Sequence, residues 1–391
     1  MILLEILLSV VPAVLLLLSG WLLLEVVAAL AAPGRRAAPD AEPGPIAVVV
    51  PAHDEASVIG ATVAGLAAQL RTQDRLLVVA DNCRDDTAER ARAAGATVAE
   101  RSDEDRRGKG YALQHAVETL RADPPAVVVF VDADCAVGSG LVRRLAGAAT
   151  ATGRPAQSLD LMLAPEGGGP GARVAEFAWT LINRTRMTGL FALTGTCRML
   201  GTGMAMPWHL LEDRSLASGE LVEDLALAIE TAGEGRGPVF VPEVVVTSRF
   251  PTSDAASTAQ RARWEHGSLA IARRAALPLF LRSVSQGRWS AAALALDVMI
   301  PPLTVMAAAL AVCFVVAAAL AVLGVVWPLL LAATACIAFA AAIGLGWWAH
   351  GREALPPAML GSLGDYAAGK LRVYGGEGRA SSRQWRRTER D

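Results

Sequence analysis

The stretch AVVVFVDADC at residues 126–135 decides the class of fold, because a run of apolar residues ends abruptly in two acids. Two runs of the same kind precede it, IAVVV at 46–50 and RLLVVA at 75–80. Short β-branched runs without alternating polar residues are typical of parallel strands that are buried on both faces. Helical patterns occur between the runs, at about 57–70, 86–94 and 109–121. This alternation predicts an α/β domain with a doubly wound sheet.

Acidic side chains follow the ends of the three predicted strands. They are Glu55 after the first strand, Asp81 after the second, and Asp132 and Asp134 after the third. Ligands of doubly wound sheets bind at the carboxyl ends of the strands, so these residues are candidates for one site. No GxGxxG sequence follows the first strand. We therefore expect a nucleotide-binding domain that is not a Rossmann dehydrogenase.

Asp132 and Asp134 place two carboxylates one residue apart. Two negative charges this close repel each other, and a hard divalent cation relieves the repulsion. Such a cation can also bridge a diphosphate and stabilise the charge of the leaving group. The alternative is an ordinary loop in which the aspartates cap the next helix. The pattern alone leaves both interpretations open.

Lys109 and Asp224 are further candidates, each with a structural alternative. Lys109 lies in the glycine-flanked segment RRGKGY at 106–111 and is one of two lysines in the chain. Glycines beside a basic side chain suit a contact with phosphate, although an exposed loop explains the segment as well. Glu223 and Asp224 begin the helical pattern LVEDLALAIETA. The helix dipole favours acids in a first turn, and one of the two could instead act as a general base.

Gln260, Arg263 and Trp264 occur within AQRARWEHG, at spacings that place all three on one face of a helix. The guanidinium of Arg263 offers forked donors for phosphate oxygens, and Trp264 offers a flat surface for a sugar ring. A helix at a membrane interface also favours arginine and tryptophan, so this second interpretation stays open.

Apolar segments at both ends of the chain predict three membrane-spanning helices. The chain is 53% hydrophobic, with a mean hydropathy of +0.39. Residues 2–32 and the segments at about 303–323 and 326–349 are each long enough to cross a bilayer core of about 30 Å. Arg35 and Arg36 follow the first span and place the next domain in the cytoplasm. The spans show no charge pairs in the sequence, which argues against a transporter.

The predicted organisation has four parts. They are a membrane anchor at 1–33, a cytoplasmic domain at 45–285, an interfacial segment with two spans at 289–349, and an amphipathic, basic cytoplasmic tail at 350–391. A net charge of −2 gives no global basicity that would indicate a nucleic-acid partner. Five scattered cysteines form no zinc or disulfide pattern and suit a reducing compartment. Abundant alanine and arginine indicate a GC-rich genome, and we expect a bacterial inner-membrane protein.

Six short motifs follow one another along the chain. They are PAHDEA (51–56), VADNCRDDT (79–87), RGKG (107–110), DAD (132–134), VED (222–224) and QRARW (260–264). Their order and separation resemble the inverting, processive-type glycosyltransferases of family 2, which include cellulose, chitin and hyaluronan synthases and ceramide glucosyltransferases. The resemblance covers about residues 46–280, and the flanking spans fit it too. It implies a GT-A fold, a UDP-sugar or related donor, and Mg²⁺ or Mn²⁺ as the cofactor.

The resemblance also implies a role for each motif residue. The residues that would bind the donor are Glu55, Asp81, Lys109, Asp132, Gln260, Arg263 and Trp264. Asp134 would bind the metal with help from Asp132, and Asp224 would be the general base. Val222 replaces the threonine of the family's TED motif, which leaves the base intact but removes a neighbouring hydroxyl. VADN replaces the more usual VDD, so Asp81 is the aspartate placed for the contact with the nucleobase.

We therefore expect a metal-dependent hexosyl- or N-acetylhexosaminyltransferase that inverts the donor and forms a β-glycosidic bond. The expected acceptor is a membrane lipid or a short oligosaccharide, because three spans hardly enclose a translocation channel without self-association or an export partner. A processive polysaccharide synthase is the alternative. An alternative of another class is a non-catalytic membrane sensor of sugar nucleotides, although a sensor would not need Asp224.

Overall fold

The computed structural model describes residues 2–31, 38–217, 222–251 and 254–366. Within these residues the core is an eight-stranded sheet with the strand order β3-β2-β1-β4-β7-β6-β8-β5. The strands are β1 Ile46–Ala52, β2 Arg75–Asp81, β3 Thr97–Arg101, β4 Val127–Phe130, β5 Ala136–Val137, β6 Ala156–Leu163, β7 Met204–Pro207 and β8 Val239–Arg249.

The first half of the sheet confirms the predicted alternation. Strands β1 to β4 pair in parallel, and the intervening helices are α2 Ile59–Ala67, α3 Thr87–Ala93 and α4 Lys109–Leu120. Val48 and Val50 pack into one hydrophobic cluster, whereas Val49 packs into another. Because side chains of a strand alternate between its faces, β1 is buried on both sides of the sheet. This explains why the strand sequences lack polar alternation.

The second half of the sheet is mixed, which the strand pattern does not predict. Strand β7 lies antiparallel between β4 and β6. Strand β6 pairs in parallel with β8, and the short β5 pairs antiparallel with β8 at the edge. Helix α5 (Leu141–Thr152) contacts β4, β6, β7 and β8. The predicted doubly wound arrangement therefore describes only the half of the sheet that carries β1 to β4.

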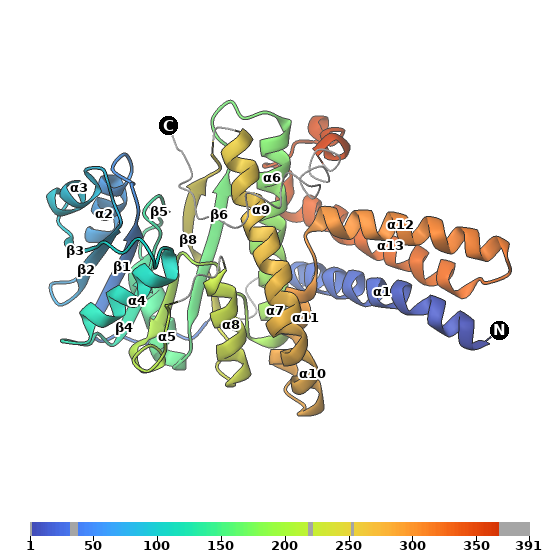
Figure 1. The fold of residues 1–391 in the computed structure, drawn as a ribbon, viewed down its shortest axis with the longest axis horizontal. Helices are drawn as coiled ribbons and strands as arrows, with labels where there is room; N and C mark the ends of the chain where they lie inside the picture. The colour runs from blue at the N-terminus through green and yellow to red at the C-terminus, as the bar shows by residue number, and fades with distance from the viewer. Residues whose placement is uncertain (1, 32–37, 218–221, 252–253, 367–391) are drawn as a thin grey trace.

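A layer of helices separates the sheet from the apolar helices (Figure 1). One continuous helical segment consists of α6 Pro170–Thr180, the π-helix η1 Leu181–Arg186 and α7 Met187–Thr194. A second consists of α9 Asp254–Ile271, the π-helix η3 Ala272–Ala276 and α10 Leu277–Ser285. The remaining helical elements are α8 Glu223–Gly233 and α11 Trp289–Met299, and η2 Trp208–Leu210, which follows β7 and packs beside β4.

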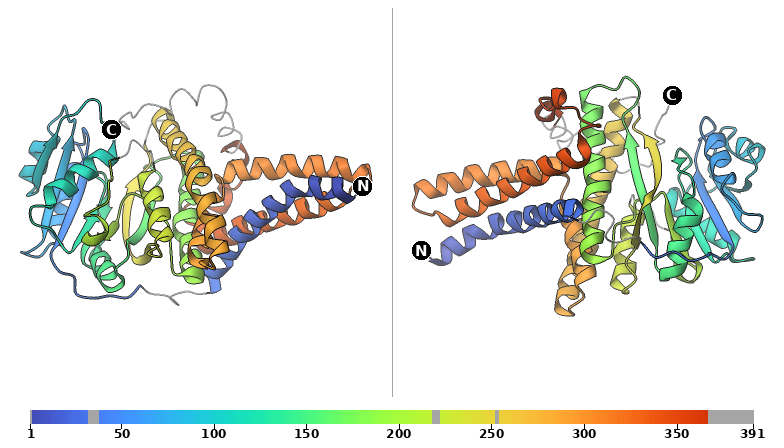
Figure 2. Two further views of the ribbon diagram at one scale, coloured as in Figure 1. Left: turned by 60° about the horizontal axis from the view of Figure 1, so that its bottom comes forward. Right: turned by 180° about the vertical axis from the view of Figure 1, so that it is seen from behind.

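Three helices are long and apolar enough to cross a membrane, by length and composition. They are α1 Ile2–Ala31, α12 Leu303–Val322, and α13 Trp327–Gly346 with its continuation η4 Trp347–Gly351. Figures 1 and 2 show them projecting together from the side of the molecule opposite β3. Helix α1 packs along α13. These bounds agree closely with the predicted spans. The predicted amphipathic and basic tail at 350–391 is described only as far as residue 366, and that part contains the short η5 (Pro357–Met359).

A buried cluster of charged side chains joins α1 to η1 and α11, contrary to the expectation that the spans carry no charge pairs. Glu25 of α1 is fully buried and accepts a hydrogen bond of 2.9 Å from Arg186 of η1. Arg186 also donates to Asp297 of α11 at 2.6 Å, and Arg198 forms an ion pair with the same carboxylate. The sequence alone does not predict this pairing, because Glu25 and Asp297 each lie more than a hundred residues from Arg186 along the chain. Two arginines and two acidic side chains thus meet where α1, η1 and α11 pack together.

Candidate active site

A large cavity of about 1250 Å³ opens where β4 and β6 end against the layer of helices. The predicted residues that line it are Lys109, Asp132, Asp134, Asp224, Gln260 and Trp264. The fold therefore gathers at one cavity the residues that four separate motifs contribute. Two predicted donor-binding residues, Glu55 and Asp81, are not on its wall.

Lys109 begins α4, directly after Gly108, whose φ of +129° favours glycine. Its ammonium lies 2.5 Å from Asp132 Oδ1 and donates to the carbonyl of Gly201 at 2.8 Å. Burial lowers the pKa of Lys109, but the charges of Asp132, Glu223 and Asp224 outweigh it and raise that pKa above its ordinary value. Lys109 is therefore a permanent cation among these carboxylates.

Gly201 allows the loop before β7 to approach this cluster. Its φ is +80°, and a Cβ atom there would lie 3.0 Å from Lys109 Nζ and 3.1 Å from Asp224 Oδ2. A side chain at this position would therefore be strained and would crowd both groups. The adjacent Thr202 accepts a hydrogen bond of 3.0 Å from the backbone nitrogen of Asp132. The loop thus ties the end of β4 to the start of α4, close to Asp224 of α8.

Asp224 lies in the first turn of α8, where its Oδ1 accepts a hydrogen bond of 2.8 Å from the backbone nitrogen of Leu225. Burial and the neighbouring Glu223 raise the pKa of Asp224 to about 7, while Lys109 opposes the rise. A carboxylate with a pKa near neutrality is suited to accept a proton from a hydroxyl group. The position and the pKa both fit the predicted general base.

Asp160 on β6 is a third acid near the Asp132–Asp134 pair, and sequence reasoning missed it. Its side chain lines the same cavity and is 3% exposed. Burial raises the pKa of Asp160 well above its ordinary value, and the charges of Asp132 and Asp134 raise it further. The one feature of the sequence that could have indicated Asp160 is its position as an acid within the apolar strand sequence AQSLDLML at 156–163. Nothing in that sequence shows which face of the strand the acid occupies.

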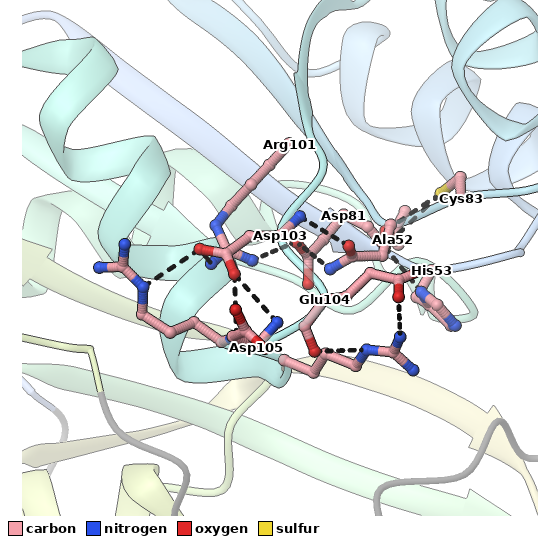
Figure 3. Close-up of polar contacts among 11 residues, drawn as sticks. Ala52, His53, Asp81, Cys83, Arg101, Asp103, Glu104 and Asp105 are labelled. Carbon is pink, nitrogen blue, oxygen red and sulfur yellow. Dashed lines mark hydrogen bonds and ion pairs between the residues drawn. The ribbon is translucent and has the colours of Figure 1, made fainter.

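Asp81 lies at the end of β2 and is buried rather than exposed on a cavity wall. Arg101 of β3 binds its Oδ1 at 2.6 Å, and a ring nitrogen of His53 lies 2.6 Å from its backbone oxygen (Figure 3). A second cavity of about 370 Å³ lies here, lined by His53, Asn82 and Arg101 among others. The backbone nitrogen of Glu55 donates to Thr87 Oγ1 at 2.7 Å, which fixes the loop after β1. Asp81 thus holds in place two residues that line the smaller cavity, Arg101 and His53.

Three potential metal ligands, Asp54, Cys83 and Asp85, lie within 4.8 Å of one another in the loops beside this smaller cavity. Asp54 accepts a hydrogen bond of 2.6 Å from the backbone of Arg84. Asp85 accepts hydrogen bonds from the backbones of Ala56 and Thr87 at 3.2 and 3.0 Å. These hydrogen bonds join the loop after β1 to the loop after β2, which gives Asp54 and Asp85 a structural role.

The QRARW motif lies on α9, as predicted. Gln260 is 6% exposed, and the ring of Trp264 lies 5.1 Å from that of Trp179, tilted by 43°. The backbone of Arg263 belongs to α9, but its side chain lies outside the described part of the structure. The predicted shared face therefore holds for Gln260 and Trp264, which both line the large cavity.

Comparison with known proteins decides the family. Residues 43–267, more than half of the chain, match the family described as glycosyltransferase like family 2. The chain belongs to this family. A comparison with functionally curated proteins gave no significant match.

Solved structures show the fold of this family member. The mannosyltransferase PcManGT from Pyrobaculum calidifontis, solved with GDP-Man and Mn²⁺, is 20% identical with a TM-score of 0.52. The match covers 85% of this chain and 99% of that one. Glucosyl-3-phosphoglycerate synthase from Mycobacterium tuberculosis is 24% identical over 59% of this chain and 80% of that one, with a TM-score of 0.41. The family and the first likeness identify the domain as a GT-A fold, as predicted.

Proposed function

We propose that this protein is an inverting glycosyltransferase that moves a sugar from a nucleotide-sugar to a hydroxyl group of a membrane lipid. The observation that carries the proposal is the extent of the large cavity. One end holds Lys109, Asp134 and Asp224, and the other is lined by Leu303 of α12 and Phe339 of α13. One continuous space thus joins the polar cluster to two helices that are apolar enough to span a membrane.

The polar end suits a nucleotide diphosphate with its metal. Asp134 and Asp132 offer hard carboxylate oxygens of the kind that Mg²⁺ and Mn²⁺ prefer, and Lys109 binds one oxygen of Asp132. We assign the metal to Asp134 with Asp132 assisting. A bound divalent cation would neutralise the charge of the departing diphosphate. The solved mannosyltransferase complex contains both GDP-Man and Mn²⁺, which supports this assignment.

The remaining predicted residues complete the donor site in this proposal. Lys109 and Arg263 bind phosphate oxygens, and Gln260 and Trp264 lie between the donor and the acceptor. Glu55 and Asp81 act from the nucleoside side, where the smaller cavity lies. Because Asp81 is buried against Arg101, we assign it the support of Arg101 and His53 rather than direct contact with the base.

Asp224 is the general base of the proposed reaction. Its carboxylate accepts the proton of the lipid hydroxyl as the oxygen attacks the anomeric carbon from the face opposite the diphosphate. The bond between that carbon and the diphosphate breaks in the same step, so an α-linked donor gives a β-linked product. Lys109, 2.5 Å from Asp132, holds that carboxylate in place beside the donor phosphates.

Nucleotide release by the full-length protein in detergent tests the proposal. UDP-glucose, UDP-N-acetylglucosamine and GDP-mannose are each supplied with Mn²⁺ and a membrane lipid extract. We expect release from at least one donor that requires metal, and a rate reduced about 10²–10⁴-fold by Asp224→Asn. Asp123→Asn, a surface acid paired with Arg75, serves as the control that keeps activity. Binding without any release would favour the sensor, and a high-molecular-weight polymer would favour the processive synthase.

A further inference from the structure

The wall of the large cavity contains buried polar atoms without a hydrogen-bond partner among the described residues. They are Asp160 Oδ1, Gln260 Oε1 and Thr304 Oγ1; the indole of Trp179 instead lies close enough to Asp160 for a side-chain hydrogen bond to its carboxyl group. Buried polar atoms in proteins are normally paired, because water no longer satisfies them. Several of them along one cavity indicate a ligand that supplies the missing hydrogen bonds. Such a ligand must itself carry several donors and acceptors.

Asp160 is the most buried of these residues in the part of the chain that the structure describes, at 3% exposed compared with 6% for Gln260. It lies in the interior of β6 and pairs with Val246 of β8. Asp160 and Met162 both line the cavity, as expected of residues two apart on one strand face. A central strand holds its side chains more rigidly than a loop does, so Asp160 has a fixed position in the wall.

The surroundings of Asp160 match a sugar ring rather than a lipid tail. Asp132, Asp134 and Lys109, which we assign to the donor phosphates and metal, act on Asp160 electrostatically. The indoles of Trp179 and Trp264 lie 5.1 Å apart in the same wall. Flat aromatic rings beside hydrogen-bonding groups suit the apolar faces and hydroxyl edges of a pyranose.

We propose that Asp160 accepts a hydrogen bond from a hydroxyl group of the sugar being transferred and thereby helps to select the donor. This inference rests on the proposed function and deepens it. Asp160 lies beside the diphosphate end of the cavity, whereas the acceptor enters past Leu303 and Phe339 at the other end. The sugar attached to the diphosphate is therefore the group that meets Asp160.

Calorimetric binding separates recognition of the sugar from recognition of the nucleotide. The full-length protein in detergent with Mn²⁺ is titrated with UDP-glucose, UDP-N-acetylglucosamine and GDP-mannose, and with free UDP and GDP. For the donor that the wild type binds most tightly, Asp160→Ala should weaken binding about tenfold. Binding of the matching free nucleotide should stay within about twofold, because the lost hydrogen bond involves only the sugar. If the alanine variant is unstable, Asp160→Val, which suits a strand, replaces it.

Two matched variants control for size and for burial. Asp160→Asn keeps a hydrogen-bonding oxygen and the size of the side chain, so it should bind the donor within about threefold of the wild type. Ser158→Ala changes a residue of the same strand whose buried Oγ also lacks a partner among the described residues but does not line the cavity. It should leave both affinities unchanged. Equal melting temperatures of these variants and the wild type show that they fold alike.

Two results would overturn the role of Asp160. Equal weakening of donor and free nucleotide by Asp160→Ala would assign the residue to the metal or the diphosphate. Unchanged donor affinity in a folded Asp160→Ala protein would remove it from sugar recognition altogether. A wild-type protein that binds neither a donor nor a nucleotide would instead refute the proposed function, together with the inference that depends on it.

Discussion

Three charged side chains at the polar end of the cavity would determine how the proposed reaction depends on pH. Lys109 contacts Asp132 directly, and Asp224 lies close enough to Lys109 for their charges to interact. Lys109 keeps its charge because the surrounding acids raise its pKa. Asp224 is the member whose protonation changes near neutrality, because burial and Glu223 raise its pKa to about 7. The protonation state of Asp224 therefore controls the rate of the proposed reaction.

The rate is expected to rise with pH up to about 7 and to level off above it. A general base must be deprotonated to act, so each pH unit below the pKa of Asp224 should lower kcat/KM about tenfold. The measurement is kcat/KM for donor turnover between about pH 5 and pH 9 with saturating Mn²⁺. The Asp123→Asn control should keep the same profile. A rate that does not change between about pH 5.5 and pH 7 would contradict the assignment of Asp224.

At the scale of elements, the contact between α1 and α7 makes the first apolar helix part of the folded core. A Cβ atom on Gly189 of α7 would lie 1.7 Å from the backbone oxygen of Glu25, so the two helices touch through their backbones. Arg186, one turn earlier, binds both Glu25 and Asp297. A fully buried ion cluster depends on all its members, because removal of one leaves an uncompensated charge.

Arg186→Met should therefore destabilise the protein by about 3–5 kcal/mol, since Glu25 would lose its arginine partner and Asp297 would keep only Arg198. Thermal unfolding in detergent, followed by circular dichroism, measures the loss. Arg75→Met is the control, because its exposed pair with Asp123 should contribute at most about 1 kcal/mol. Similar melting temperatures of the Arg186 and Arg75 variants would show that the cluster does not hold α1 to the fold.

The sequence predicts elements better than it predicts contacts between distant elements. The strands β1 and β2 and the three spans are evident because each depends on a local run of apolar residues. The gathering of Lys109, Asp132 and Asp224 followed from motif order. Asp160 and the Glu25–Arg186 pair could not be predicted, because the burial of a single acid depends on elements distant from it in the sequence; Arg186, for example, is 161 residues from Glu25. Strand β7 could not be predicted either, because it has only four residues and pairs antiparallel with its neighbours.

At the scale of the whole molecule, one cavity joins the polar cluster to two helices that are apolar enough to span a membrane. Its apolar end is lined by Ile300, Leu303, Phe339 and Ile343, and its polar end by the donor residues. A water-soluble acceptor would have no need of this apolar end. Figure 2 shows the apolar helices beside the helical layer, an arrangement that the proposed transfer to a lipid would use.

Ile343→Trp should block the apolar end without disturbing the donor. Overpacking this wall of α13 is expected to reduce transfer to lipid about tenfold or more, while slow hydrolysis of the donor by water stays unchanged. Ile337→Trp is the matched control, since Ile337 lies on the same helix and is 69% exposed. Both rates are measured on one preparation by nucleotide release with and without lipid. Equal lipid transfer by the two variants would show that the acceptor does not use this route.

The most direct test of the central claim is transfer of radiolabelled sugar into lipid by the full-length protein in bacterial lipid vesicles. Labelled UDP-glucose, UDP-N-acetylglucosamine and GDP-mannose are supplied with Mn²⁺, and the products are separated by organic extraction. We predict label in the organic phase for at least one donor, in a β-linkage, abolished by chelation of the metal and by Asp224→Asn. Label confined to a water-soluble polymer, or no metal-dependent product from any donor, would contradict the account.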